Sequence, residues 1–209
     1  MTKAVLLFVA FLFLRVQAAT TTAPSLQMSL DNIDVGRLPA NVTAFGVFTV
    51  QLFEGHKVIE LPGEPLDSMG LMVGPEKGIT GITARIHAIA SGRRFPEFGV
   101  GLAGTSGYKL WLIPAQKVVQ LQKGDEVLAS VAYTAWATAT WTTFRLQLQK
   151  KSDGGTTISG RIWQDGRAEP REATITAEDK ESPAEGRAAV WANPYSGTPL
   201  RFSDIMLVP

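Results

Sequence analysis

The chain has 209 residues but no cysteine, and it has only two histidines, His56 and His87. The absence of cysteine excludes disulfides, thiolate metal ligands, cysteine nucleophiles and a lipid-anchored cysteine. A zinc-type site needs three or four ligands, and neither an H-x-H nor an E-x-x-H spacing supplies them. The sequence also lacks an excess of either charge, since 20 basic residues face 19 acidic ones. This balance argues against a nucleic acid partner, which requires a basic surface.

The N-terminal segment has the features of a secretory signal peptide. Lys3 is followed by an unbroken apolar run, 4–14, and small residues suitable for cleavage follow at 16–19. The apolar run is shorter than the roughly 20 residues that a transmembrane helix needs. We therefore expect a signal peptide over 1–19 and a secreted or periplasmic protein with no transmembrane segment after cleavage. A retained membrane anchor is the alternative.

Strand and turn patterns fill the rest of the chain, and no helical period is sustained. Residues 20–30 read as a linker and 31–209 as one domain. Asp-Gly and Gly-Gly pairs, as at 153–155 and 165–166, suit the turns of β-hairpins. Many short strands joined by hairpins predict an all-β fold in which two antiparallel sheets pack as a β-sandwich of the jelly-roll type.

Four segments, in this order and spacing, resemble one superfamily. Residues 31–39 (DNIDVGRLP) resemble an opening motif D-F-E…x-G-x-L-P, and 141–146 (WTTFRL) resemble a strand W-x-x-hydrophobic-basic-hydrophobic. Residues 160–170 (GRIWQDGRAEP) resemble G-K-V-W-x-x-G-x-x-E-P, and 202–208 (FSDIMLV) resemble a closing strand F-D-D-hydrophobic-x-V. Together they resemble the concanavalin A-like lectin/glucanase superfamily, including its laminin G-like and 3-keto-disaccharide hydrolase-like bacterial domains.

The resemblance implies a concanavalin A-like sandwich, but one fold hosts many functions. Laminarinase-type enzymes on this fold carry an E-x-D-x-(x)-E strand that supplies the catalytic carboxylates. That spacing is absent here. We expect the acidic residues to be solvated, including an acidic patch of Glu178, Asp179 and Glu181.

A candidate ligand platform follows from strand alternation. In 82–88 the apolar side chains take one face, while Arg85 and His87 take the other. Extending the alternation to 97–113 adds Glu97, Lys109 and Trp111 to the same polar face. Trp111 would stack on a sugar ring beside Arg85, and the polar groups would hydrogen-bond its hydroxyls. The alternative is an ordinary amphipathic outer face.

The neighbouring residues predict where the other tryptophans lie in the fold. Trp136, Trp141 and Trp163 lie in or beside hydrophobic stretches, so we expect them in the core. Trp191 suits either the core or its rim.

The resemblance also implies a possible structural Ca²⁺ between the first and last strands, with Asp204 as a ligand. Calcium takes six to eight oxygens, and the sequence indicates only one or two.

Three functions remain open. The first is a non-catalytic exported module that binds carbohydrate or another cell-surface ligand on its concave face. The second is a glycoside-processing hydrolase of the 3-keto-disaccharide hydrolase-like type, with Arg85, His87 and Glu97 as its first candidates. The third is a structural or protein-interaction domain of the cell envelope.

Overall fold

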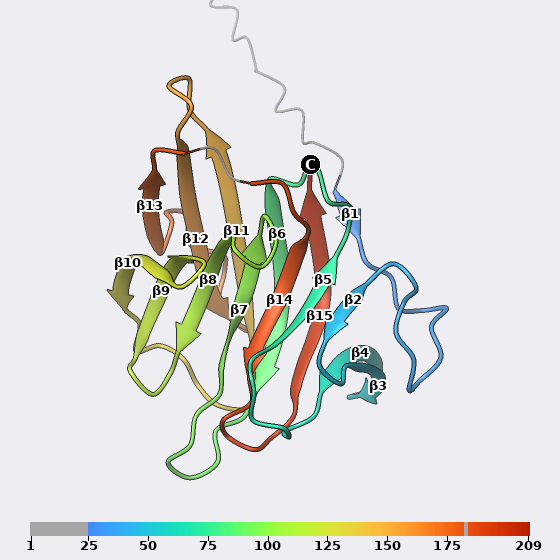
Figure 1. The fold of residues 1–209 in the computed structure, drawn as a ribbon. Helices are drawn as coiled ribbons and strands as arrows, with labels where there is room; N and C mark the ends of the chain where they lie inside the picture. The colour runs from blue at the N-terminus through green and yellow to red at the C-terminus, as the bar shows by residue number, and fades with distance from the viewer. Residues whose placement is uncertain (1–24, 182–183) are drawn as a thin grey trace, which may run out of the picture.

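A computed structural model describes residues 25–181 and 184–209. The predicted signal peptide, 1–19, lies outside these residues. The described residues contain fifteen strands and no helix, and the strands form two antiparallel sheets (Figure 1). No stretch of the described chain therefore forms a helix that could cross a membrane. The predicted all-β sandwich is confirmed.

The first sheet has eight strands. Across the sheet these are β13 (Ile175–Asp179), β12 (Thr156–Gln164), β11 (Thr140–Lys150), β6 (Gly81–Ala88), β15 (Leu200–Val208), β4 (His56–Leu61) and β3 (Thr49–Phe53). The eighth strand, β1 (Leu26–Gln27), pairs with β15, and the next amide, of Met28, donates to the Ile205 carbonyl at 2.9 Å. Residues 26–28 of the expected linker are thus hydrogen-bonded to this sheet.

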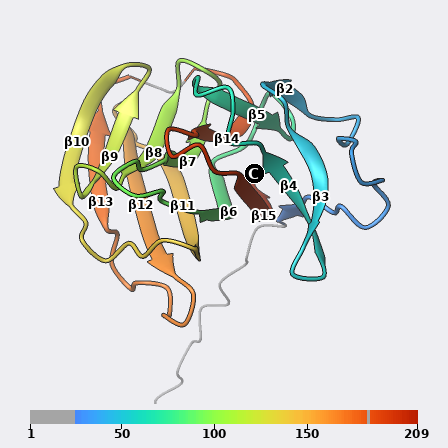
Figure 2. The same cartoon turned by 90° about the horizontal axis from the view of Figure 1, so that it is seen from below.

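The second sheet has seven strands. Across the sheet these are β10 (Glu126–Ala132), β9 (Val118–Lys123), β8 (Tyr108–Ile113), β7 (Glu97–Leu102), β14 (Ala188–Asn193), β5 (Met69–Val73) and β2 (Thr43–Phe45). Figure 2 shows the two sheets as separate layers that face each other.

The core lies between the layers, where alternate residues of each strand point inward. Strand β12 follows the pattern strictly, since every second residue from Thr156 to Gln164 is buried. Aromatic pairs join the sheets. The ring centroids of Phe98 in β7 and Phe144 in β11 are 5.6 Å apart. Trp136 packs against this core, 6.2 Å from Phe98, as expected.

Two tryptophans are placed differently from the prediction. Trp141 and Trp163 lie on the outer face of the eight-stranded sheet and are only half-buried. Trp141 alternates onto the same side of β11 as Arg145, and Trp163 onto the same side of β12 as Arg161. Both arginines point outward. The inward positions of β11 are taken by Phe144 and Leu146. The prediction that Trp141 and Trp163 belong to the core is wrong.

A polar contact ties the two layers together at one side. The Tyr108 hydroxyl in β8 donates to Asp179 Oδ2 in β13 at 2.8 Å, and Lys123 Nζ lies 2.7 Å from the same oxygen. The hydrogen bond from Lys123 lowers the pKa of Asp179 to about 2, and burial raises the pKa of Tyr108 to about 12. The Asp179 side chain is only 11% exposed. Asp179 is thus not part of a solvated acidic patch.

Candidate functional site

The five predicted platform residues lie on both sheets. Arg85 and His87 belong to β6 of the eight-stranded sheet, whereas β7 and β8, which carry the other three, belong to the seven-stranded sheet. The chain crosses from one layer to the other between β6 and β7, so β6 pairs with β11 and β15 instead. The prediction that all five side chains share one sheet face is wrong, because the outer faces of the two layers point in opposite directions.

On the eight-stranded sheet, Arg85 is held by neighbours. Its guanidinium contacts Asp165 Oδ2 at 2.5 Å and Asp204 Oδ2 at 3.0 Å, and it lies 5.0 Å from the ring centroid of Trp141. His87 is buried, with its ring centroid 4.9 Å from that of Phe53 and 5.4 Å from that of Trp141. Burial, and then the charge of Arg201, lower the pKa of His87. These side chains are already engaged with one another.

The Asp204 carboxylate is already engaged by its neighbours. Asp204 Oδ2 accepts hydrogen bonds from Arg85 and from the Ser203 hydroxyl, at 3.0 and 3.2 Å. A guanidinium at this distance repels a divalent cation from the same carboxylate. Within residues 25–181 and 184–209, no three acidic, histidine or cysteine side chains gather as metal ligands. Calcium binding at Asp204 stays a prediction.

The outer face of the seven-stranded sheet carries a continuous row of aromatic residues and glycines. Strand register places Gln120 beside Trp111, Trp111 beside Gly99, and Gly99 beside Trp191. The row continues from Trp191 to Gly70 and then to Phe45. Aromatic side chains thus occupy every second strand from β8 to β2. Because neighbouring strands are about 4.8 Å apart, these positions recur at about 10 Å. We call Trp111, Trp191 and Phe45 the aromatic row.

Glycine is required at one position on each strand beside Trp191 because the indole lies flat on the sheet. A Cβ at Gly70 would overlap the indole Cζ3 atom, and a Cβ at Gly101 would lie 2.8 Å from the indole Nε1 atom. The ring thus covers the backbone of both neighbouring strands, β5 and β7.

The two indoles form a small apolar cluster on this outer face. Trp111 and Trp191 are 7% and 8% exposed, and they pack with Met72, Ile113 and Ala189. Lys109 Nζ lies over the Trp191 ring, 4.5 Å from its centroid. The expectation of an exposed Trp111 beside Arg85 is therefore wrong, because Trp111 is buried and because it lies on the other sheet from Arg85.

Polar atoms on the same face lack partners. Trp191 Nε1 and Asn193 Oδ1 are buried and have no hydrogen-bond partner among the described residues. Asn193 Nδ2 donates to Glu97 Oε2 at 3.1 Å, and Gln122 donates to Gln120 at 2.8 Å. Buried polar groups without partners are uncommon in folded proteins.

Lys109 also lacks an ionic partner. Among the described residues, no carboxylate lies within 4.0 Å of its ammonium group. Burial lowers the pKa of Lys109, although the charge of Asp125 opposes the effect.

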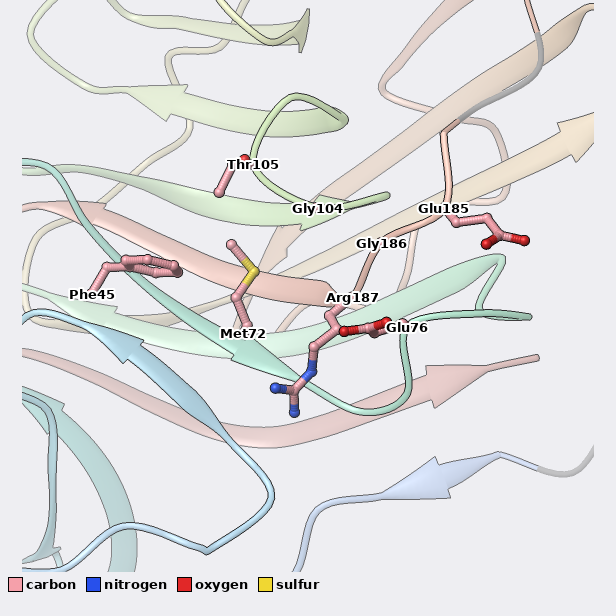
Figure 3. Close-up of a pocket in the computed structure, with 8 residues that line it drawn as sticks. All are labelled: Phe45, Met72, Glu76, Gly104, Thr105, Glu185, Gly186 and Arg187. Atoms are coloured by element: carbon pink, nitrogen blue, oxygen red, sulfur yellow. The ribbon is translucent and has the colours of Figure 1, made fainter.

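A pocket of about 350 Å³ lies at the end of this face (Figure 3). Its walls come from β2, β5, the turn after β7 and the segment before β14, and they comprise Phe45, Met72, Glu76, Gly104, Thr105, Glu185, Gly186 and Arg187. Phe45 is 49% exposed, and Met72 joins the pocket to the cluster around Trp191. Glu185 is paired with Lys77 at 2.6 Å, and both side chains are well exposed.

Sequence reasoning did not find this pocket. The alternation in β2 puts Thr43 and Phe45 on one face, which is a local signal. Only the pairing of Phe45 with Gly70 places its ring next to Trp191.

Comparisons with solved structures identify the fold. A carbohydrate-binding module, CBM66 from Bacillus subtilis, superposes with a TM-score of 0.54 at 12% identity, covering 80% of this chain and 95% of its own. The metal-free carbohydrate recognition domain of Emp46p gives 0.54 at 14% identity, covering 85% and 92%. The β-glucanase of Bacillus licheniformis gives 0.53 at 10% identity, covering 90% and 99%.

The chain has the concanavalin A-like jelly-roll fold. No protein-family model matches the sequence, and no curated protein matches it either. At these identities the concanavalin A-like likeness concerns the fold, and the function has to be argued from the site.

Proposed function

We propose that this protein is an exported, non-catalytic module that binds carbohydrate on the outer face of its seven-stranded sheet. The site comprises the aromatic row and the pocket beside Phe45. The observation that carries the proposal is the pair of unpartnered buried atoms, Trp191 Nε1 and Asn193 Oδ1, within a face on which the Phe45 ring is exposed. One atom is a donor and the other an acceptor.

A sugar ring suits such a face chemically. The C–H groups of a pyranose form an apolar surface that packs on an aromatic ring, and its hydroxyls both donate and accept hydrogen bonds. Phe45 offers an exposed ring at the pocket. The unpartnered indole N–H would donate to one hydroxyl oxygen, and Asn193 Oδ1 would accept from another. The amides of Gln120 and Gln122 lie on the same face.

The repeat of the aromatic row favours a chain of sugars over a single one. Rings about 10 Å apart would contact alternate residues of an extended oligosaccharide. Only Phe45 is exposed in the free protein, so contact with the two indoles requires covering side chains such as Lys109 to move aside. The fold supports the proposal, since three proteins that share it are named for binding carbohydrate or acting on glucan.

Binding is favoured over hydrolysis by the positions of the polar residues. Arg85 and His87 lie on the opposite layer from Glu97, so the three cannot act on one substrate. Glu76 and Glu185 both line the pocket, but both are solvated, and Glu185 is engaged by Lys77. Neither carboxylate is buried in an apolar environment, which is one established way to prepare a catalytic acid.

The test is a glycan array of the full chain, followed by titration calorimetry with the best oligosaccharide. We expect Phe45→Ala to weaken binding by about tenfold or more, because aromatic contacts are a main source of affinity in such sites. Trp163→Phe is the matched control, since Trp163 lies on the other layer and should not affect binding. Absence of glycan binding would contradict the proposal and favour a structural or protein-interaction role. Loss of binding in the control variant alone would move the site to the other sheet.

Export is tested separately by expressing the full chain in a bacterial host. The mass of protein recovered from the periplasm or medium should correspond to cleavage after Ala18 or Ala19. Retention of the uncleaved chain in the cytoplasm would contradict this part of the proposal.

A further inference from the structure

A second pocket lies between the two layers and has a mostly apolar lining. Its volume is about 490 Å³. It opens between β1 and β15 of one sheet and the end of β5 in the other, and its apolar wall comprises Leu26, Met28, Val73, Pro75, Ile205 and Leu207. We call it the interlayer slot. Its volume falls within the range of small-molecule sites, about 300–1,000 Å³.

Arg187 lies at the border of the interlayer slot, and its charge is not neutralised. Its guanidinium donates from Nε to the Gly74 carbonyl at 2.7 Å and from Nη1 to the Thr43 hydroxyl at 2.9 Å. Nη2 donates to the Asn41 carbonyl. All three acceptors are neutral. Among the described residues, no carboxylate lies within 4.0 Å of this guanidinium.

The other half-buried arginines of the described chain are all paired. Arg85 contacts Asp165 and Asp204, Arg145 and Arg161 contact Glu169, and Arg201 contacts Glu60. The remaining described arginines are exposed. Removing a positive charge from water without an acidic partner is costly, so Arg187 is the exception that needs an explanation.

We propose that the interlayer slot binds an aliphatic monocarboxylate, with the carboxylate on Arg187 and the hydrocarbon tail between the sheets. A guanidinium has five N–H groups, and Arg187 uses three of them within the protein. The two that remain can donate to the two oxygens of one carboxylate. The apolar wall would take the tail out of water. Arg187 also lines the pocket on the outer face, but in Figure 3 its guanidinium points away from Thr105 and Glu185 of that pocket.

The direct test is titration calorimetry of the full chain with decanoate, decanol and acetate. We expect decanoate to bind about tenfold or more tighter than decanol, because only decanoate gains charge-assisted hydrogen bonds. Acetate should not bind detectably, since it lacks the tail. Equal affinities for decanoate and decanol would overturn the proposal, as would equal affinities for acetate and decanoate.

A charge placed at the rim gives a test that does not disturb Arg187. Leu26 lines the slot and is 48% exposed, so its side chain can be changed without cost to the core. Leu26→Glu should bind decanoate about tenfold more weakly than Leu26→Gln does, because the new carboxylate repels the ligand, whereas the two variants should bind decanol equally. Leu26→Gln is the matched neutral control. The same affinity for decanoate in both variants would overturn the proposal.

Arg187→Gln should abolish the preference for decanoate over decanol. This change also removes hydrogen bonds that hold β2, β5 and β14 together. If the variant does not fold, the comparison of Leu26→Glu with Leu26→Gln tests the proposal instead. Phe45→Ala, which alters the carbohydrate site, should leave decanoate binding unchanged, so the two proposals can fail independently.

Discussion

The ammonium group of Lys109 lies over the indole of Trp191, 4.5 Å from the ring centroid. The two residues stand on β8 and β14, which are separated by β7. The β7 residue paired with Lys109 is Gly101, which has no side chain to keep them apart. Lys109, which has no acidic partner among the described residues, therefore covers the ring that we assign to sugar binding. Ligand stacking on Trp191 requires Lys109 to move aside.

Lys109→Ala should expose Trp191. The change removes a cation–π contact worth about 0.5–1 kcal/mol, so the protein should be slightly less stable. The fraction of tryptophan emission quenched by acrylamide should rise in Lys109→Ala. It should not rise when the same change is made in a Trp191→Phe background. Lys150→Ala, at the exposed end of β11, is the control. Unchanged quenching in Lys109→Ala would show that Lys109 does not cover the ring.

Gly70→Ala should destabilise the protein because its Cβ would overlap the Trp191 ring. Forcing extra atoms into a packed site costs about 1–3 kcal/mol. In a Trp191→Leu background the same substitution should cost much less, since the overlapping ring is absent. Urea unfolding of the two single variants and the double variant measures this coupling. Equal costs in both backgrounds would mean that the indole does not lie on β5.

His87 should make stability depend on pH in the mildly acidic range. Burial and the charge of Arg201 lower the pKa of His87 in the folded state, while the charge of Glu54 and a hydrogen bond to the Ala139 carbonyl oppose the effect. Its unfolded pKa is near 6.5. The unfolded chain therefore binds the proton more readily, and the contribution of neutral His87 is present above pH 6.5 and is lost as the pH falls through the folded pKa.

Urea unfolding between pH 5 and pH 7, a range that brackets the ordinary histidine pKa, measures this dependence. In His87→Gln the free energy of unfolding should vary less with pH. His56→Gln, which alters the exposed second histidine, should behave like the wild type. A dependence that persists in His87→Gln would assign it to another group.

Asp179 should govern stability in strong acid. Its pKa falls from 3.8 to about 2 because of Lys123, so the folded state favours the ionised carboxylate. The stabilisation is fully present above about pH 4 and is lost as the pH falls through about 2. Asp179→Asn should thus be clearly less stable than the wild type at pH 7 and nearly equal to it at pH 2. Asp67→Asn, in an exposed loop, is the control. A constant difference across this range would contradict the assignment.

The sequence by itself determined the fold class of this protein. Alternation within a strand and the residues of a tight turn are local properties. Gly124 and Gly166, for example, adopt the positive φ that their turns require, at 56° and 80°. Local alternation also correctly separated Arg85 and His87 from the apolar face of β6. The same rule applied to Trp141 and Trp163 would have placed them beside Arg145 and Arg161, but their hydrophobicity suggested the core instead.

Only the tertiary structure decided which strands are neighbours, and therefore where the site lies. Alternation states which residues share a face of one strand, but it does not indicate that the chain changes layers between β6 and β7. That crossing separates Arg85 and His87 from Glu97, Lys109 and Trp111. The pairing of Trp191 with Gly99 and Gly70 joins segments far apart in the sequence. Because hydrogen bonds between distant strands set this register, the aromatic row could not be predicted from any one segment.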